Sequence, residues 1–333
     1  MQKKLIALAV AGIMAAPMAA QAASAEIYGK VRLSVDMADN GDTTAGNEDS
    51  TLSVSSHSSR FGVKGSEDLD GDLKALYQIE AQVNMDDGDD FSEKLRDSYV
   101  GLSGSFGTVL AGKLSTPYKN AGKKADIFVD TAGDYNNIIE HDTRASNAIA
   151  YVAPKMGGVT IAAAYVPSAT DDDLPQTTAD SEMDAVSVSA EYKADALSVA
   201  LAFESIGDDD DSIKLAGTYG MGDTTLGFVY QNNDDGTNDY DVIYGSLSHK
   251  MGDTTLKLAV GSKGETDSNE DDSTMFVVGA SKSYSKAVEL YALYGSVSNG
   301  DNAHTGLKSV KGAVDGETVS VLSAGVNLKF SSM

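Results

Sequence analysis

The sequence contains no cysteine and no Gly-x-Ser-x-Gly motif, and only four of its residues are histidine. Without cysteine, the chain can form neither a disulfide framework nor a thiolate metal site. The histidines lack the spacing of zinc ligands, and the motif that places a catalytic serine on a sharp turn is missing. We therefore expect no catalytic site, no metal and no cofactor, with a membrane hydrolase as the remaining enzymatic alternative. His141, which stands between Glu140 and Asp142, is expected to lie on the surface.

Basic residues are scarce, with 25 lysines and arginines against 50 aspartates and glutamates and a formal net charge of −25. Such acidity argues against a nucleic-acid partner, because nucleic acid is recognised through a basic face. Many of the acids occur in runs, none of which has the EF-hand pattern, and we interpret these runs as solvated loops. The runs are 86–87, 89–90, 171–173, 208–211 and 270–272.

No apolar run is long enough for a transmembrane helix, which needs about 18 consecutive apolar residues. The longest apolar stretch, Leu5 to Ala20, is short, contains Pro17 and follows two lysines near the start of the chain. A basic start, a short apolar centre and small residues at a cleavage site are typical of a secretory signal peptide. We expect residues 1–25 to be removed after Ala22 or Ala25, which takes the formal charge from −25 to −27 because two lysines leave.

Alternation between apolar and polar residues is the dominant pattern of the rest of the chain. Residues 197–204, for example, place Leu, Val, Leu and Phe on one face and Ser, Ala, Ala and Glu on the other. A period of two over about ten residues predicts a strand with one apolar and one polar face. Sixteen segments of this kind occur, at about 26–37, 51–65, 72–85, 94–103, 107–114, 145–154, 158–166, 183–193, 196–206, 211–220, 224–232, 239–249, 254–262, 273–283, 287–297 and 317–330.

The connections between these segments are alternately tight and long, which is typical of an outer-membrane β-barrel. A soluble β-sandwich would show the same alternation. The barrel is favoured for two reasons. The polar faces are rich in Lys, Glu, Gln and Ser, which suit a water-filled lumen. In addition, tyrosines on the apolar faces lie near segment ends, where the aromatic girdle of a membrane barrel meets the membrane–water interface. Those tyrosines are Tyr28, Tyr99, Tyr165, Tyr219 and Tyr294. We predict an all-β fold, a sixteen-stranded antiparallel transmembrane barrel, and one domain over residues 26–333, since no linker divides the chain.

Several segments resemble the general diffusion porins of Gram-negative outer membranes, which are trimeric sixteen-stranded barrels. The resemblance covers nearly all of the chain after the signal peptide, and the block from Arg60 to Leu69 is its most specific part. It is carried by residues 27–30 (IYGK), 59–69 (SRFGVKGSEDL), 96–102 (RDSYVGL), 106–109 (FGTV), 112–113 (GK), 144–151 and Pro154. The resemblance implies an outer-membrane location, a homotrimer, contact with outer-membrane lipid and lipopolysaccharide, and passive passage of small hydrophilic solutes.

In that family the third long loop folds into the barrel and sets a constriction against basic side chains on the wall. Residues 115–143 match this loop, and they are the longest stretch with neither strand alternation nor an acidic run. The resemblance implies basic wall residues Lys30, Arg60, Arg96, Lys113 and Arg144, and acidic loop residues Asp126, Asp130 and Asp134. The loop departs from the enteric pattern at 129–133, where VDTAG replaces a Pro-Glu-Phe-Gly turn, and Ser331-Ser332-Met333 follow the terminal phenylalanine, Phe330.

Opposed charges across a narrow water-filled gap create a transverse field that favours polar solutes. The simpler alternative is that these basic side chains only make the lumen face polar and pair with nearby carboxylates. Two other functions stay open, a solute-specific porin and a barrel whose acidic loops bind a ligand, a divalent cation, lipopolysaccharide or a surface partner. A sugar channel would need an aromatic track, but only Tyr118 and Tyr135 flank the loop and Trp is absent. A general channel is therefore favoured, with its preference for cations or anions undecided.

Overall fold

The computed structural model describes residues 24–42, 50–86, 95–169, 183–264, 272–301, 303 and 305–332. Residues 1–23, most of the expected signal peptide, lie outside these ranges. Most of the acidic runs between 86 and 90, at 171–173 and at 270–272 also lie outside them, whereas the run at 208–211 is described.

Strands make up most of the described chain, as the period-two alternation predicts. They are β1 (Ser24–Asp39), β2 (Ser50–Ser56), β3 (Arg60–Asp68), β4 (Lys74–Gln82), β5 (Ser98–Gly104), β6 (Gly107–Ser115), β7 (Arg144–Val152), β8 (Val159–Ala169), β9 (Met183–Ala194), β10 (Leu197–Ile206), β11 (Asp210–Met221), β12 (Thr224–Asp234), β13 (Asp239–Met251), β14 (Thr254–Lys263), β15 (Ser273–Ser283), β16 (Val288–Asn299) and β17 (Val319–Ser331). Two short helical segments, α2 (Pro117–Gly122) and the 3₁₀ turn η1 (Tyr135–Asn137), lie between β6 and β7. None of the helices in the described ranges is long and apolar enough to cross a membrane.

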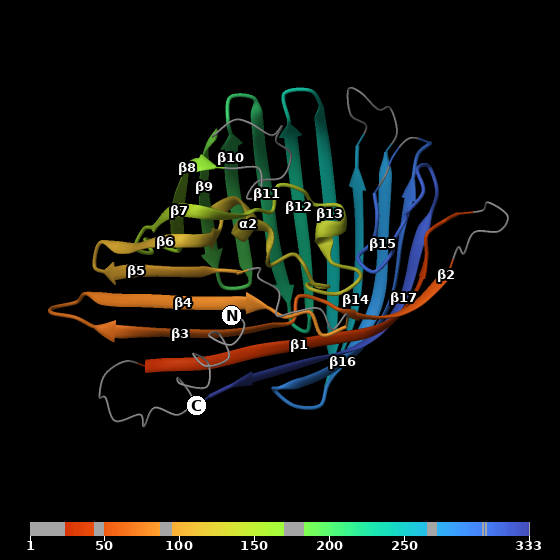
Figure 1. The fold of residues 1–333 in the computed structure, drawn as a ribbon, viewed down its shortest axis with the longest axis horizontal. Helices are drawn as coiled ribbons and strands as arrows, with labels where there is room; N and C mark the ends of the chain where they lie inside the picture. Colours follow the sequence, from red (N-terminus) through yellow and green to blue (C-terminus); the bar gives the residue numbers. More distant parts are fainter. Residues whose placement is uncertain are drawn as a thin grey trace, which may run out of the picture.

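The strands form one closed antiparallel sheet. Each strand pairs with its neighbours along the chain, except that β2 and β3 both pair with β1, and β17 pairs with β1 from Tyr28↔Ser331 to Asp39↔Ser320. This last pairing leaves no open edge. The labels reach 17 because the wall strand expected over 51–65 is broken into β2 and β3, both of which pair with β1. The predicted sixteen-stranded barrel is confirmed (Figure 1).

The break between β2 and β3 is a bulge in which residues 57–59 stand opposite two residues of β1. Ser58 has a φ of 52°, in the left-handed region. The backbone N–H of Arg32 donates to Ser59 Oγ at 2.9 Å, which bridges the gap in the ladder. Bulges re-aim side chains and are frequent beside functional sites. Here the bulge lies beside Arg32 and Arg60, which both point to the same aspartate inside the barrel.

The apolar face of the strands lies on the outside of the barrel. In β10, Leu201 and Phe203 are 56% and 39% exposed, whereas Ala202 and Glu204 between and beside them are each 2% exposed. A soluble sandwich would bury the apolar face instead. The sandwich alternative is therefore wrong, and the outer surface is the lipid-facing surface of a membrane barrel.

The tyrosines expected at the membrane interface divide between the two faces. Three are more than 40% exposed on the outside: Tyr165, Tyr219 and Tyr294. For Tyr28 and Tyr99 the expectation was wrong, because both face inward. Tyr28 OH donates to Glu80 at 2.9 Å, and Tyr99 packs against a buried cluster. The alternation itself places Tyr28 on the same face as Lys30, which is the polar face of β1.

The segment between β6 and β7, residues 116–143, is called L3 from here on. It lies inside the ring of strands, where α2 is visible in Figure 1. Its apolar side chains, including Phe128 and Ile138, pack with Val229 and Val277 of the inner wall in one buried cluster. Burying a side chain of this size contributes about 1.5–3 kcal/mol. Apolar burial therefore explains why the loop folds inward rather than away from the barrel.

Candidate functional site

L3 begins with a capped helix. Thr116 Oγ1 accepts a hydrogen bond from the backbone N–H of Lys119 at 3.2 Å, and Pro117 occupies the first turn. A threonine cap followed by proline is a favourable helix start. Tyr118 is fully buried against the wall. Lys119 and Lys123, which are four residues apart and so lie on the same face, both line the central cavity.

Both ends of L3 are fixed to β11 and β12 by buried polar contacts. Lys214 Nζ lies 2.5 Å from Asp142 Oδ1 and 4.0 Å from the centre of the Tyr118 ring. Gln231 Nε2 donates to Tyr118 OH and to the carbonyl of Glu140, each at 2.8 Å. Burial alone would raise the pKa of Asp142, but the ammonium of Lys214 outweighs it and holds that pKa below its usual range. The carboxylate is therefore charged and anchors the loop.

The tip of L3 reaches the opposite wall. Asp130 Oδ2 lies 2.5 Å from Arg60 Nη2 and 3.2 Å from Arg32 Nη1, and Arg32 also donates to the carbonyl of Val129. Burial alone would raise the pKa of Asp130, but the guanidiniums of Arg60 and Arg32 lower it below its ordinary value. L3 therefore crosses the bore, from β11 and β12 on one side to β1 and β3 on the other.

A cavity of about 610 Å³ lies between L3 and the wall formed by β1, β3, β4 and β7. Its charged lining residues are eight basic groups, Lys30, Arg60, Lys64, Arg96, Lys119, Lys123, Arg144 and Lys308, and six acidic groups, Glu80, Asp97, Asp126, Asp130, Asp134 and Asp142. The formal charge of this lining is +2, in a chain whose total is −25. The lining of this cavity therefore carries a net positive charge, unlike the chain as a whole.

Seven of the eight residues that the resemblance assigned to the constriction line this cavity: Lys30, Arg60, Arg96, Arg144, Asp126, Asp130 and Asp134. Lys113 is not among the lining residues, and its Nζ donates to Ser146 Oγ at 2.9 Å. The ladder between β6 and β7 shifts register between Gly112 and Leu114. Gly112 has a φ of 145°, and this irregularity interrupts the simple alternation of faces at Lys113.

The three loop aspartates do not form a free acidic row. Asp130 is bonded to guanidinium groups, and Asp134 Oδ2 lies 2.9 Å from the ammonium of Lys308. Burial and the nearby carboxylate of Asp134 raise the pKa of Asp126 well above its usual range, which favours its neutral form. With Asp126 neutral, the formal charge of the cavity lining rises from +2 to +3.

Two wall arginines are also paired. Arg96 Nε lies 2.8 Å from Glu80 Oε1, and Arg144 Nε lies 2.7 Å from Asp97 Oδ1. Pairing fixes the planar guanidinium groups without neutralising the whole cluster, because basic groups outnumber acids.

The structure adds residues that the sequence reasoning missed. Arg32, which lies 3.2 Å from Asp130, was not among the predicted site residues. Lys119 and Lys123 could have been found from the Thr-Pro helix start and their spacing of four. Lys308 comes from the segment between β16 and β17, whose backbone N–H at Lys308 donates to Asn137 of L3 at 3.0 Å. Its place depends on long-range packing, for which the sequence carries no local signal.

His141 was wrongly expected on the surface. It is 5% exposed, and its Nδ1 lies 3.6 Å from Asp210 Oδ1 of β11. Burial lowers its pKa, which favours the neutral ring. The last turn of L3 is packed against the barrel wall, so this histidine is part of the anchor of the loop.

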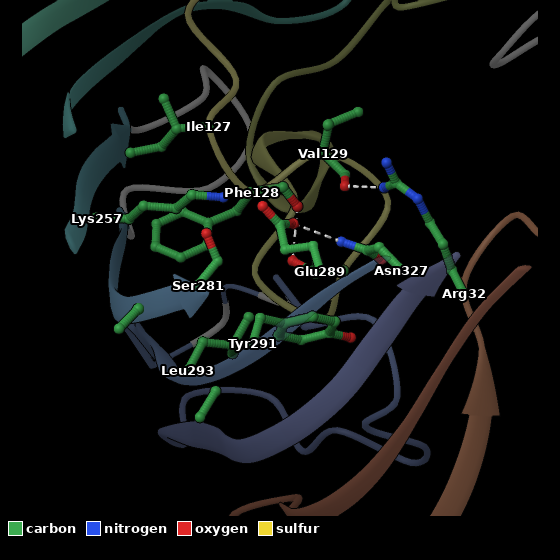
Figure 2. Close-up of a pocket in the computed structure, with 13 residues that line it drawn as sticks. Arg32, Ile127, Phe128, Val129, Lys257, Ser281, Glu289, Tyr291, Leu293 and Asn327 are labelled. Atoms are coloured by element: carbon green, nitrogen blue, oxygen red, sulfur yellow. Dashed lines mark hydrogen bonds between the residues drawn. The ribbon is translucent and has the colours of Figure 1, made fainter. Parts of the chain in front are cut away.

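A smaller pocket lies beside the tip of L3, among β1, β14, β15, β16 and β17 (Figure 2). Lys257 Nζ lies 5.8 Å from the centre of the Phe128 ring, and Asn327 donates to Glu289 at 2.9 Å. Its volume of about 50 Å³ has room for only a few water molecules. The larger basic cavity is therefore the candidate path for solutes.

A closed barrel with an apolar outer face and a charged, water-accessible bore defines an outer-membrane channel. The chain belongs to the Gram-negative porin family, whose sequence profile matches residues 7–302. Its location is the outer membrane, and a member of this family of channels is not an enzyme.

Known relatives agree with this assignment. The chain is 29% identical over 337 residues to outer membrane porin protein 32 of Delftia acidovorans, a match that covers 93% of both chains. It is 30% identical to major outer membrane protein P.IB of Neisseria gonorrhoeae, but that match spans only 50% of this chain and 49% of the relative. Among solved structures, the anion-selective porin from Comamonas acidovorans has a TM-score of 0.79 and 25% identity, covering 92% of this chain and 100% of its own. OmpT of Vibrio cholerae, at a TM-score of 0.70 and 16% identity, shares the fold.

Proposed function

We propose that the protein is a passive channel for small hydrophilic solutes and ions, constricted by L3 and selective for anions. The observation that carries the proposal is the charge of the central cavity, with eight basic groups against six acids, one of which favours its neutral form. In a confined, water-filled bore with low-dielectric walls, each charge acts more strongly on a passing ion than it would on an open surface. The similar porin from Comamonas acidovorans is described as anion-selective, which agrees with this direction.

The general channel is preferred to a sugar-specific one because the loop tyrosines have no free faces. Tyr118 and Tyr135 are 0% and 2% exposed, so neither offers a ring on which a sugar could stack. A specific channel would instead need such a track along the bore.

We further propose that the chain is exported with residues 1–25 as its signal peptide and assembles as a homotrimer in contact with outer-membrane lipid and lipopolysaccharide. One solved OmpT of Vibrio cholerae is described as a trimer form, which supports the trimer by analogy of fold. β1 begins at Ser24, so cleavage after Ala22 would keep the whole strand. The mass of the mature protein distinguishes the two cleavage sites.

Swelling of proteoliposomes tests the proposed transport. The protein is placed in isosmotic solutions of three solutes of similar size, one anionic, one neutral and one cationic. We expect entry of all three, fastest for the anion, without saturation. Equal rates for the three solutes, or entry of one solute only, would contradict an anion-selective general channel.

A further inference from the structure

Two of the basic groups in the cavity belong to L3 itself and have only uncharged hydrogen-bond partners. Lys119 Nζ donates to the backbone carbonyl of Asp142 at 2.5 Å, and Lys123 Nζ donates to the side-chain oxygen of Asn120 at 2.6 Å. The wall arginines, by contrast, are bonded to carboxylates. The two lysines therefore keep more of their positive charge available to a solute than the arginines do.

The surroundings of the two lysines are mostly basic. The charged groups that act on Lys119 are Asp142, Arg144, Lys123 and Lys214, and those that act on Lys123 are Asp97, Arg144, Asp142 and Arg96. Asp97 is bonded to Arg144 and Asp142 is bonded to Lys214, so both nearby acids are already engaged. The side of the cavity formed by α2 and the start of β7 is thus a local excess of positive charge.

We infer that Lys119, Lys123 and Arg144 form a binding subsite for divalent oxyanions within the channel. Lys119 and Lys123 supply two ammonium point charges from L3, and the planar guanidinium of Arg144, at the start of β7, supplies donors that match oxygen pairs. The subsite rests on the proposed anion-selective function and names the solute class that function favours most. It also makes L3 a basic element of the constriction, in addition to the acidic role that the resemblance implied.

The subsite carries a pH dependence that the arginines lack. Loss of hydration inside the barrel is the main cause that lowers the pKa of Lys119 to about 8, against the opposing pull of Asp142. The same cause lowers the pKa of Lys123. Arginine stays protonated up to a pH of about 12. The charge of Lys119 is therefore present below a pH of about 8 and is lost as the pH rises through that value, whereas the arginines stay charged.

Planar-bilayer recordings of the full-length mature protein test the subsite, with sulfate as the probe because it stays divalent at neutral and alkaline pH. The variants are Lys119→Gln/Lys123→Gln, the conservative Lys119→Arg/Lys123→Arg, and the control Lys286→Gln in the exposed turn between β15 and β16. At neutral pH we expect the glutamine variant to weaken sulfate block of the chloride current about tenfold and to lower the chloride-to-potassium permeability ratio about threefold. Heat-dependent gel mobility verifies that each barrel is folded.

The pH series separates a binding role from a purely structural one. The unmodified channel and the Lys286→Gln control should lose sulfate block between about pH 7 and about pH 9.5, whereas the arginine variant should keep it. An anion-selective channel whose sulfate block is unchanged by pH and by the glutamine variant would overturn the subsite and leave the proposed function intact. A channel that prefers cations would overturn the proposed function and the subsite with it.

Discussion

Replacing Asp130 by asparagine is the most informative change in the constriction. The carboxylate of Asp130 lies 2.5 Å from Arg60 and 3.2 Å from Arg32, so its removal leaves two guanidinium groups without their shared counter-charge. Asparagine has nearly the same shape and keeps an acceptor oxygen for Arg60. The tip of L3 should therefore stay in place while one negative charge leaves the bore.

The expected size follows from the electrostatics. A unit charge about 5 Å from a passing ion contributes about 1–3 kcal/mol for effective dielectric constants between about 80 and about 20. Salt screening reduces this effect in a water-filled bore, so the lower figure applies. About 1 kcal/mol corresponds to about a fivefold change in the permeability of one ion. Because the charge acts in opposite directions on anions and cations, the ratio of anion to cation permeability should rise at least about fivefold.

Asp126→Asn is the matched control within the same loop. Because burial and Asp134 raise the pKa of Asp126 well above its usual range, which favours the neutral carboxyl group, its replacement should change the permeability ratio much less than Asp130→Asn does. The double variant should then match Asp130→Asn alone. Reversal potentials in a salt gradient measure all three variants. Equal shifts for Asp126→Asn and Asp130→Asn would refute the reasoning that assigns different charge states to the two residues.

Three further predictions concern the wall and the anchors of L3. Arg96→Gln removes a cavity charge, and we expect about a threefold fall in anion preference by reversal potential, with no change counting against a role for the wall. Lys214→Met leaves the buried carboxylate of Asp142 without its main counter-charge, which costs about 3 kcal/mol of stability. Because this pair anchors L3, single-channel current should become noisier, and the noise should begin at a lower voltage. Quiet traces like those of the unmodified protein would contradict a role of Lys214 as an anchor. Gly29→Val adds a side chain at the pairing of β1 with β17, where a Cβ would lie 2.3 Å from the ring of Phe330. The refolding yield and the melting temperature should therefore fall. An unchanged melting curve would show that the β1–β17 closure tolerates the added bulk.

The barrel could be predicted from the sequence because each strand carries its own alternating pattern. The broken wall strand could not, since the bulge at Ser58 depends on a left-handed backbone and on bonds to β1. Lys113 shows the same limit. The resemblance implied that its side chain is part of the constriction, but Lys113 lies at the register shift between Gly112 and Leu114 and does not line the cavity.

Part of the lining of the central cavity was predictable from the sequence, but the bonds between its residues were not. Resemblance brought Arg60 and Asp130 to the same constriction, yet it implied a gap between them, whereas they are in direct contact. The path of the loop is set by apolar packing of residues such as Phe128 against the far wall, which is a long-range property. Lys308 was missed for the same reason.

The sign of the zero-current potential across a potassium chloride gradient shows directly whether the channel prefers anions or cations. Purified, unboiled protein is inserted into a planar bilayer with concentrated salt on one side. An anion-selective constriction makes the dilute side negative, because chloride crosses faster than potassium. A dilute side that becomes positive would mean that the acidic loops outweigh the basic cavity, and it would contradict the account.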